Sequence, residues 1–324
     1  MERLVSMLRA AGDTTRLRLL LLLRQAELTV SELTQIVGQS QPRVSRHLKL
    51  LCDAGLIDRF KEGSWVFYRG ADAGAGAELG RAIIQRSLAD SPIVSADMQR
   101  LAQVRDARAA EAAAYFKANA GEWERIRALH APEKDVEAAI ARQIGNVQID
   151  HLLDAGTGTG RMLELLGSKV RRAVGLDVSP EMLAIARDRL MRAGLTQCQV
   201  RLGNTYRLPF PDGGAHGGFD AVVFHQVLHY LDDPSAAIAE AARVMRQGGR
   251  ILIADFAPHT LEFLRTDFAH RRLGFSDREV QGWFHAAGLK PLTAETVAGH
   301  GAKEKLTVKL WLATRPSLRK AEAA

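Results

Sequence analysis

The feature that most constrains the fold of this chain is the run LLDAGTGTGRM at residues 152–162, followed by VGLDVSP at 174–180. The apolar residues before the glycines predict a short buried strand. Gly156, Gly158 and Gly160 let the backbone turn sharply and approach a ligand without Cβ clashes. The run therefore predicts a strand, a turn and a helix built around a ligand.

The next predicted strand indicates what kind of ligand this is. Residues 173–176 are apolar and end in Asp177, whose carboxylate could accept hydrogen bonds from the two hydroxyls of a ribose. A dinucleotide fingerprint needs a third glycine at the position of Arg161, and a P-loop needs Gly-Lys-Ser/Thr at the turn. Neither is present, so a ribose fits this turn better than a phosphate group.

The D-x-G-x-G-x-G run at 154–160, with the acidic residue at the end of the next strand, resembles the class I S-adenosylmethionine-dependent methyltransferases. Residues 199–234 look like that family's third and fourth strands with their loops. The resemblance implies an α/β Rossmann-like fold over residues 146–314 and S-adenosylmethionine or S-adenosylhomocysteine as the bound ligand, without a metal. The residues it assigns to that ligand are Asp154, Gly156, Thr157, Gly158, Gly160, Asp177, Val178, Asn204, Thr205 and His225.

One of these positions departs from the family pattern. Asn204 stands where the family usually has an Asp that accepts a hydrogen bond from the adenine amino group, and its side-chain carbonyl is expected to accept in the same way. The rest of the domain follows in order. Apolar patterning predicts strands at 219–224, 250–256, 292–297 and 306–313, and helices at 234–245, 262–273 and 277–287.

No motif in the sequence identifies the methyl acceptor. The loop after the fourth strand reads His225-Gln226-Val227-Leu228 and lacks the Asp/Asn-Pro-Pro-aromatic run of amino-group nucleic-acid methyltransferases. Cys52 and Cys198 do not supply the nucleophile of a cytosine-C5 enzyme or the several thiolates of an arsenite enzyme. The catalytic residues are unknown at this stage. His225 and His229 are the candidates for a general base, with a structural role as the alternative for both, and the same holds for Asp255.

The first part of the chain carries a second, independent pattern. Asp13 is placed to cap an apolar helix, and Thr29 with Glu32 forms the start of another. A third helix follows over residues 41–51, and strands at 56–61 and 64–69 form a hairpin around Glu62-Gly63. This order predicts an α+β winged helix-turn-helix.

Residues 1 to 95 resemble the ArsR/SmtB family of bacterial repressors, most specifically in SQPRVSRHLKLLCDAGLI at 40–57. The resemblance implies that the helix at 41–51 enters the major groove of DNA. The residues it assigns to DNA are Gln41, Ser45 and Arg46 at base edges, Arg43, Lys49, Arg59 and Lys61 at phosphates, and His47 on the outward face. Thr29 and Ser31 replace the two cysteines of the family's metal box, so no metal is expected.

Composition agrees with two folded parts and with DNA contact. The 324 residues carry 44 Lys and Arg against 37 Asp and Glu, a net charge of +7 that suits a polyanion. Two cysteines indicate a reducing, cytoplasmic environment, and neither a signal peptide nor a membrane span is expected.

The segment between the two parts is expected to join them. Residues 71–76 are expected to be a small-residue spacer, and residues 78–89 and 96–118 to be helices. Residues 96–145 are expected to form a helical linker that pairs two chains and covers the ligand, with a role as a spacer only as the alternative for its Ala-rich helix. Tyr115, Phe116 and Trp123 are the expected lid residues. Residues 315–324 are expected to be a flexible tail.

Three functions remain open from the sequence. The first is a DNA-binding transcriptional repressor, dimeric on a palindromic operator, that senses either adenosyl ligand and controls methionine-cycle genes. The second is an active small-molecule methyltransferase whose DNA-binding part controls its own operon. A nucleic-acid methyltransferase ranks last because the Pro-Pro loop is missing.

Overall fold

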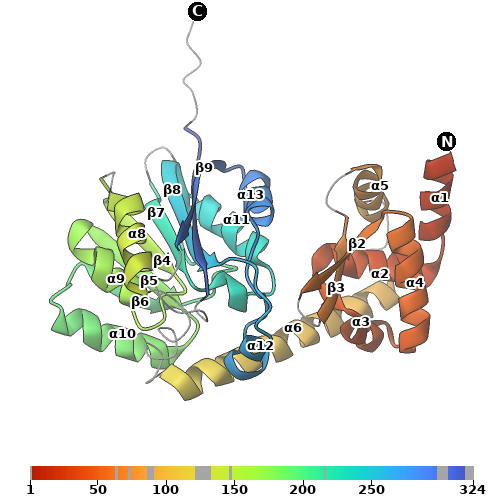
Figure 1. Cartoon of the computed structure of the whole chain (residues 1–324), viewed down its shortest axis with the longest axis horizontal. Coiled ribbons are helices and arrows are strands. Elements are labelled where there is room, and N and C mark those ends of the chain that lie inside the picture. The colour runs from red at the N-terminus through yellow and green to blue at the C-terminus, as the bar shows by residue number, and fades with distance from the viewer. Residues whose placement is uncertain are drawn as a thin grey trace, which may run out of the picture. The chain divides into compact units, whose positions relative to one another are not determined.

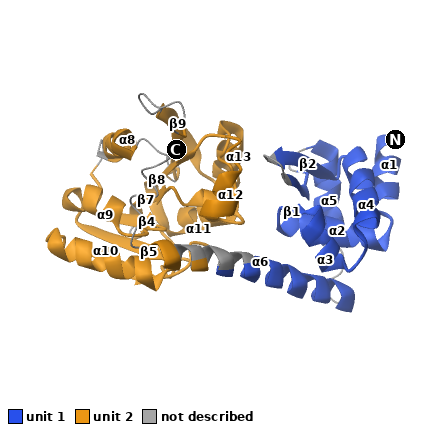
Figure 2. Cartoon of the chain, turned by 60° about the horizontal axis from the view of Figure 1, so that its bottom comes forward, with its two compact units in different colours: residues 1–111 blue, residues 112–324 orange. Residues whose placement is uncertain are grey.

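The computed structural model describes residues 2–62, 65–71, 74–85, 91–120, 133–145, 148–214, 217–297 and 306–317. The chain forms two compact units, residues 1–111 and 112–324 (Figure 2). The elements of the first unit are α1 (Glu2–Ala11), α2 (Thr14–Gln25), β1 (Leu28–Thr29), α3 (Val30–Val37), α4 (Gln41–Asp53), β2 (Ile57–Glu62), β3 (Trp65–Gly70), α5 (Gly74–Gln85) and the start of α6 (Pro92–Asn119) (Figure 1).

The helix starts of the first unit follow the predicted caps. The Asp13 carboxylate accepts from the Arg16 N–H at 3.0 Å at the start of α2. Thr29 and Glu32 form a full capping box on α3, in which each side chain accepts from the other residue's backbone N–H. The apolar faces of the helices pack into one core that includes Leu19, Leu33 and Leu48. The predicted order of helices and wing strands is confirmed, although the wing turn at 63–64 lies outside the described residues.

A buried ion pair fixes α6 to the core of the first unit. Asp97, which is 1% exposed, accepts from Arg18 Nε at 2.6 Å and from Arg18 Nη2 at 2.7 Å. Arg18 also donates to the Val37 carbonyl at 3.0 Å. Both charges are therefore paired and hydrogen-bonded, as burial requires. The boundary between the two units falls within this helix of 28 residues.

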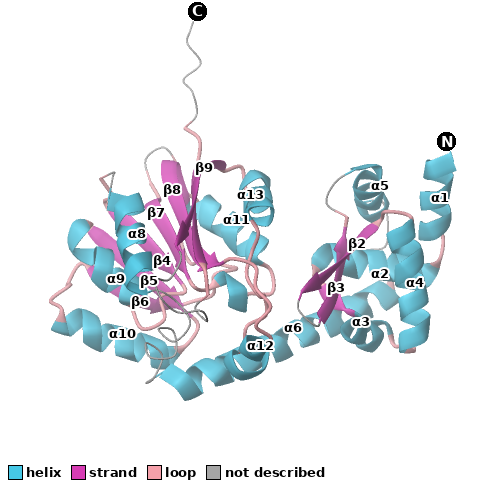
Figure 3. Ribbon diagram, viewed as in Figure 1, coloured by secondary structure: helices cyan, strands magenta, loops and turns pink. Residues whose placement is uncertain are grey.

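The second unit is a seven-stranded sheet with helices on both faces (Figure 3). The strand order is β6-β5-β4-β7-β8-β10-β9, in which only β10 runs antiparallel to both its neighbours. Its strands are β4 (His151–Ala155), β5 (Arg172–Asp177), β6 (Cys198–Leu202), β7 (Phe219–His225), β8 (Met245–Phe256), β9 (Lys290–Val297) and β10 (Val308–Thr314). Its helices are α8 (Glu133–Gly145), α9 (Arg161–Leu166), η2 (Gly167–Lys169), α10 (Pro180–Arg192), η3 (Leu228–Tyr230), α11 (Pro234–Val244), α12 (Phe263–Phe268) and α13 (Asp277–Ala286).

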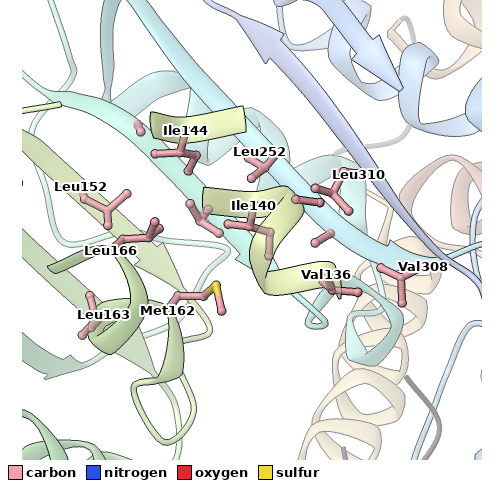
Figure 4. Packing of buried hydrophobic residues seen from close by; sticks show 14 of the residues in the cluster. Val136, Ile140, Ile144, Leu152, Met162, Leu163, Leu166, Leu252, Val308 and Leu310 are labelled. Carbon is pink, nitrogen blue, oxygen red and sulfur yellow. The ribbon is translucent and has the colours of Figure 1, made fainter. Parts of the chain in front are cut away.

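Alternation along each strand divides the core of this unit between the two faces of the sheet. Leu152 packs in one cluster with residues of α8 and α9, whereas its neighbour Leu153 packs in the other with residues of α11 and α13. Figure 4 shows Val136, Ile140 and Ile144 of α8 lying over Leu252 in the first cluster. Both faces are thus covered, as expected for parallel strands. The Rossmann-like fold predicted for this part is confirmed.

Several predicted elements differ from the structure, and β8 begins at Met245 instead of residue 250. The helix expected at 262–273 is only α12, because Ala269 adopts a left-handed conformation with φ of 55° and ends it. The N–H groups of Arg271 and Arg272 then donate to the His229 carbonyl at 2.8 and 3.1 Å, so this segment is held outside a helix. The spacer expected at 71–76 is shorter, since α5 already begins at Gly74.

Some predictions fall on residues that the structure does not describe. These are residues 86–89, Trp123, the side chains of Tyr115 and Phe116, and the tail from 318 onward. No helix within the described ranges combines the length and the hydrophobicity that a bilayer span requires.

Candidate functional site

The recognition helix α4 presents most of its predicted DNA contacts to solvent. Gln41, Arg43, Arg46 and Lys49 are exposed, and Ser45 is half-buried. The buried face of the same helix carries Val44, Leu48 and Leu51, which anchor it in the core of the first unit. Arg59 and Lys61 of β2 are also exposed. These cations are available to phosphates.

His47 lies differently from the other predicted contacts. Its side chain is 15% exposed and its Nδ1 lies 3.8 Å from the Asp13 carboxylate at the start of α2. Burial lowers the pKa of His47, and the Asp13 charge opposes that shift. The ring therefore links α4 to α2 and offers little of its surface outward.

The glycine turn lies at the carboxyl end of β4, where the sheet order reverses. β5 and β6 continue on one side of β4 and β7 and β8 on the other, which is where open α/β sheets bind ligands. The N–H groups of Gly156 and Thr157 donate to the Leu176 carbonyl at 2.7 and 2.9 Å and tie the turn to the end of β5. Gly156 has φ of 80°, and a Cβ there would lie 2.5 Å from Val227 Cγ2. Only glycine fits this position.

Asp154, the acidic residue at the start of the turn, forms a hydrogen bond with another residue of the same turn. Asp154 is 1% exposed and accepts from the Thr157 hydroxyl at 2.5 Å. Gly158 and Gly160 follow with φ of 52° and 85°, and α9 begins directly after Gly160. Contacts within the chain itself therefore determine the shape of the turn.

Asp177, the predicted ribose acceptor, joins this turn to the second strand. One of its carboxylate oxygens accepts from the Gly158 N–H at 2.8 Å and the other from the Ser179 N–H at 2.9 Å. Burial raises the pKa of Asp177, and these backbone donors oppose the shift. Each oxygen keeps a second lone pair, so the carboxylate can also accept from two hydroxyls.

Three of the residues predicted to bind the ligand lie on the loops after β5 and β6. Val178 is 52% exposed after β5, and Thr205 is buried. The Asn204 side-chain oxygen accepts from the Tyr206 N–H at 2.9 Å. One lone pair of the predicted acceptor is thus already used within the loop.

The turn after β7 holds a residue that the sequence did not single out. Gln226 has φ of 54°, a conformation that non-glycine residues rarely adopt, and is 5% exposed. Its N–H donates to the Ala254 carbonyl at 2.7 Å and its amide donates to Glu133 at 3.2 Å. Strained backbone of this kind clusters at functional sites. The sequence alone gives no indication that a glutamine here adopts a positive φ.

The two candidate histidines have different surroundings. His225 ends β7 and is 6% exposed. His229 is 1% exposed, and its Nδ1 lies 2.7 Å from Oδ1 of Asp255 at the end of β8. The structure thus brings together His229 and Asp255, which the sequence had considered separately. Among the described residues, no group of three or more His, Cys, Asp or Glu is arranged to hold a metal ion.

Comparison with known proteins agrees with this geometry. Residues 13–59 match the family model of bacterial regulatory proteins of the arsR family, and residues 153–253 match that of a methyltransferase domain. A probable S-adenosylmethionine-dependent methyltransferase of Mycolicibacterium smegmatis is 32% identical over 46% of this chain and 60% of its own length. The malonyl-[acyl-carrier protein] O-methyltransferase of Serratia marcescens is 29% identical over 54% of this chain and 65% of its own length.

These matches span less than two thirds of the length of either relative. Among solved structures, the putative methyltransferase in complex with the Haloferax volcanii Trm112 activator shares the fold, with a TM-score of 0.50 and 22% identity over 62% of this chain and 97% of that one. The chain therefore carries an arsR-family helix-turn-helix region followed by a methyltransferase domain of the class I fold.

Proposed function

We propose that this chain is a DNA-binding transcriptional repressor whose methyltransferase domain binds S-adenosylmethionine or S-adenosylhomocysteine as its effector. The observation that carries this proposal is the pairing, in one chain, of an exposed basic recognition helix with a glycine turn closed by Asp177. Methionine-cycle genes are the expected targets, because the two ligands report the state of that cycle.

The DNA-binding half of the proposal rests on charge and on a free apolar surface. Arg43, Arg46 and Lys49 are exposed on α4, and the whole chain carries a net charge of +7. On α1, Leu4 and Leu8 are 44% and 49% exposed and lie one helical turn apart. A second copy of the chain that covers these leucines would give a symmetric dimer, and such a dimer reads a palindromic operator.

The ligand-binding half rests on the shape of the glycine turn. The Asp177 carboxylate would accept hydrogen bonds from the ribose hydroxyls. Gly156, Gly158 and Gly160 have no side chains, so they would let the ligand approach the main chain of the turn closely. Val178, Thr205 and Asn204 would lie along the adenine. The bound sulfonium supplies an activated methyl group, and it is also the feature by which S-adenosylmethionine differs from its product.

The helix α6 supplies a physical basis for coupling. Near its start, Asp97 is buried in a pair with Arg18 of the first unit. Near its end, Lys117 pairs with Glu181 at 3.6 Å, and Glu181 accepts from the hydroxyl of Ser179, the residue whose N–H binds Asp177. A ligand at Asp177 that favours one arrangement of this helix by about 1 to 3 kcal/mol changes DNA affinity about 5- to 150-fold.

Calorimetric titration of the full chain with each adenosyl ligand tests the ligand half. We expect both ligands to bind the wild type and neither to bind Gly158→Arg, because Gly158 has φ of 52° within the turn and an arginine side chain there would fill space that the ligand needs. Asp177→Asn should weaken binding of both ligands, and Arg43→Ala should leave it unchanged because Arg43 lies on α4. Absence of heat with the wild type, or wild-type binding by Gly158→Arg, would contradict the proposal.

A second candidate function is favoured by the buried His229–Asp255 pair. It is an active methyltransferase of a small molecule whose DNA-binding unit controls its own operon. The relatives named above as methyltransferases agree with this function. Transfer of a labelled methyl group from S-adenosylmethionine to a metabolite extract would separate it from a purely sensory domain.

A further inference from the structure

The pair of His229 and Asp255 lies at the same end of the sheet as the glycine turn. His229 belongs to η3 after β7, and Asp255 stands near the end of β8, which runs parallel to β7 with His225 opposite Ala254. Val227, two residues before His229, fills the space into which a Cβ on Gly156 would project. The histidine therefore follows directly on the turn that contacts the glycine loop.

The hydrogen bonds of Asp255 determine where His229 carries its proton. Asp255 Oδ1 lies 2.7 Å from His229 Nδ1 and also accepts from the Phe256 N–H at 2.8 Å, while Oδ2 accepts from the His229 N–H at 3.3 Å. A carboxylate can only accept, so Nδ1 holds the hydrogen and Nε2 holds the lone pair. The hydrogen bonds found among the described residues engage the ring through Nδ1 and leave Nε2 available.

The ring is held in place from several sides. Tyr230, His270 and Phe256 have ring centroids 4.1, 4.2 and 4.9 Å from that of His229. The His229 carbonyl accepts from the N–H groups of Arg271 and Arg272, which fixes the backbone that carries the ring. A fixed imidazole with an unused lone pair, next to a carboxylate that stabilises its charged form, is the arrangement of a general base.

We propose that His229 is the general base of a methyl transfer to a phenolic hydroxyl, and that Asp255 positions it. This inference rests on the second candidate function above, in which S-adenosylmethionine donates the methyl group. The acceptor oxygen attacks the methyl carbon, the carbon–sulfur bond breaks, and its electron pair stays on sulfur as a neutral thioether. The hydroxyl proton moves to His229 Nε2, so the positive charge lost by the sulfonium is regained on an imidazolium paired with Asp255.

A hydroxyl is the acceptor for which such a base matters most. An amine attacks through a lone pair that it already has, and a thiol is partly ionised at neutral pH, whereas a hydroxyl must lose its proton as the bond forms. The rings of Tyr230, Phe256 and His270 around the imidazole favour an aromatic acceptor, because aromatic rings prefer offset or edge contacts with one another.

Several other ionisable residues surround His229. Asp255 of β8 faces Nδ1, while His270, Arg271 and Tyr230 approach from the neighbouring segments. His259 is close enough for the His229 charge to lower its pKa, after the larger effect of burial. A pH profile of the transfer must therefore be compared between variants, not interpreted for one protein alone.

Tritiated S-adenosylmethionine and the full chain provide the test, with catechol and 4-hydroxybenzoate as probes. His229→Asn keeps an N–H donor for Asp255 and removes Nε2, so it separates proton transfer from folding. We expect it to lower the transfer rate by about 100-fold or more and to remove the rise of the rate with pH. Its dissociation constant for S-adenosylhomocysteine should stay within about 3-fold of wild type, an energy change below about 1 kcal/mol.

His285→Asn is the matched control, since His285 is an exposed histidine of α13 in the same unit. It should transfer methyl groups at the wild-type rate. Wild-type activity or an unchanged pH profile in His229→Asn overturns the role of His229. Binding of S-adenosylmethionine without transfer to either phenol overturns the acceptor class. Failure to bind the donor at all would instead overturn the adenosyl-binding proposal and this inference with it.

Discussion

Replacing Gly156 by alanine tests how tightly the turn after β4 is constrained. The residue has φ of 80°, and an added Cβ would lie 2.5 Å from Cγ2 and 2.7 Å from Cγ1 of Val227. Left-handed backbone costs an alanine about 1 to 2 kcal/mol. Overpacking against Val227 adds about 1 to 3 kcal/mol. Gly156→Ala should therefore lower the free energy of unfolding of the second unit by about 2 to 5 kcal/mol.

Gly194 provides a control for the backbone contribution. It has φ of 67°, but nothing lies within 4 Å of an added Cβ. Gly194→Ala should therefore cost only the conformational part, about 1 to 2 kcal/mol. Urea unfolding of the full chain, followed by tryptophan fluorescence, measures both, because Trp283 and Trp311 belong to the second unit.

The steric part can also be isolated by a double variant. Val227→Ala removes both methyl groups that an alanine at 156 would meet, so Gly156→Ala combined with Val227→Ala should recover about 1 to 3 kcal/mol relative to additivity. Equal costs for Gly156→Ala and Gly194→Ala, or strict additivity with Val227→Ala, would refute the claim that Val227 closes this turn.

Four other outcomes follow from the structure. Asp97→Ala leaves Arg18 buried without its partner and should destabilise the first unit by about 3 to 5 kcal/mol, measured by thermal unfolding. The pKa of His259 is lowered to about 4, mainly by burial, so unfolding takes up a proton below about pH 6.5 and stability falls as the pH drops from there toward 4. His259→Asn should flatten that slope in urea titrations at several pH values. Arg43→Ala should reduce the salt slope of DNA binding by about one in anisotropy titrations across salt concentrations, with weaker binding to all sequences. Leu8→Glu should shift the proposed dimer toward monomer in light scattering and weaken DNA binding with it.

Much of the fold could be predicted because the conformations that individual residues prefer match the elements in which they lie. Capping residues such as Asp13 and Thr29 predict where helices begin. The turn after β4 has positive φ angles and therefore requires its glycines. The alternation of Leu152 and Leu153 toward opposite faces follows from strand geometry alone. Such features depend on residues close in sequence.

The remaining features depend on contacts between segments distant in the chain. The pairing of His229 with Asp255 spans 26 residues and depends on the parallel register of β7 and β8. The helix expected to reach residue 273 ends early because the backbone of Arg271 and Arg272 binds the His229 carbonyl. His47 matches an outward position by helical periodicity, yet Asp13 and burial hold it against α2. Neither local propensity nor periodicity predicts which distant residues will be in contact.

We propose that an adenosyl ligand in the second unit controls DNA binding by the first, and this coupling can be measured. It is tested most directly by measuring the affinity of the full chain for a DNA duplex that the protein has selected from a random-sequence pool. The titration is performed without ligand, with saturating S-adenosylmethionine and with saturating S-adenosylhomocysteine. We expect at least one ligand to shift the dissociation constant by about 5- to 150-fold, and we expect Asp177→Asn to lose this shift while keeping its ligand-free DNA affinity. Equal DNA affinity in all three conditions, with the ligand site shown by calorimetry to be filled, would contradict it.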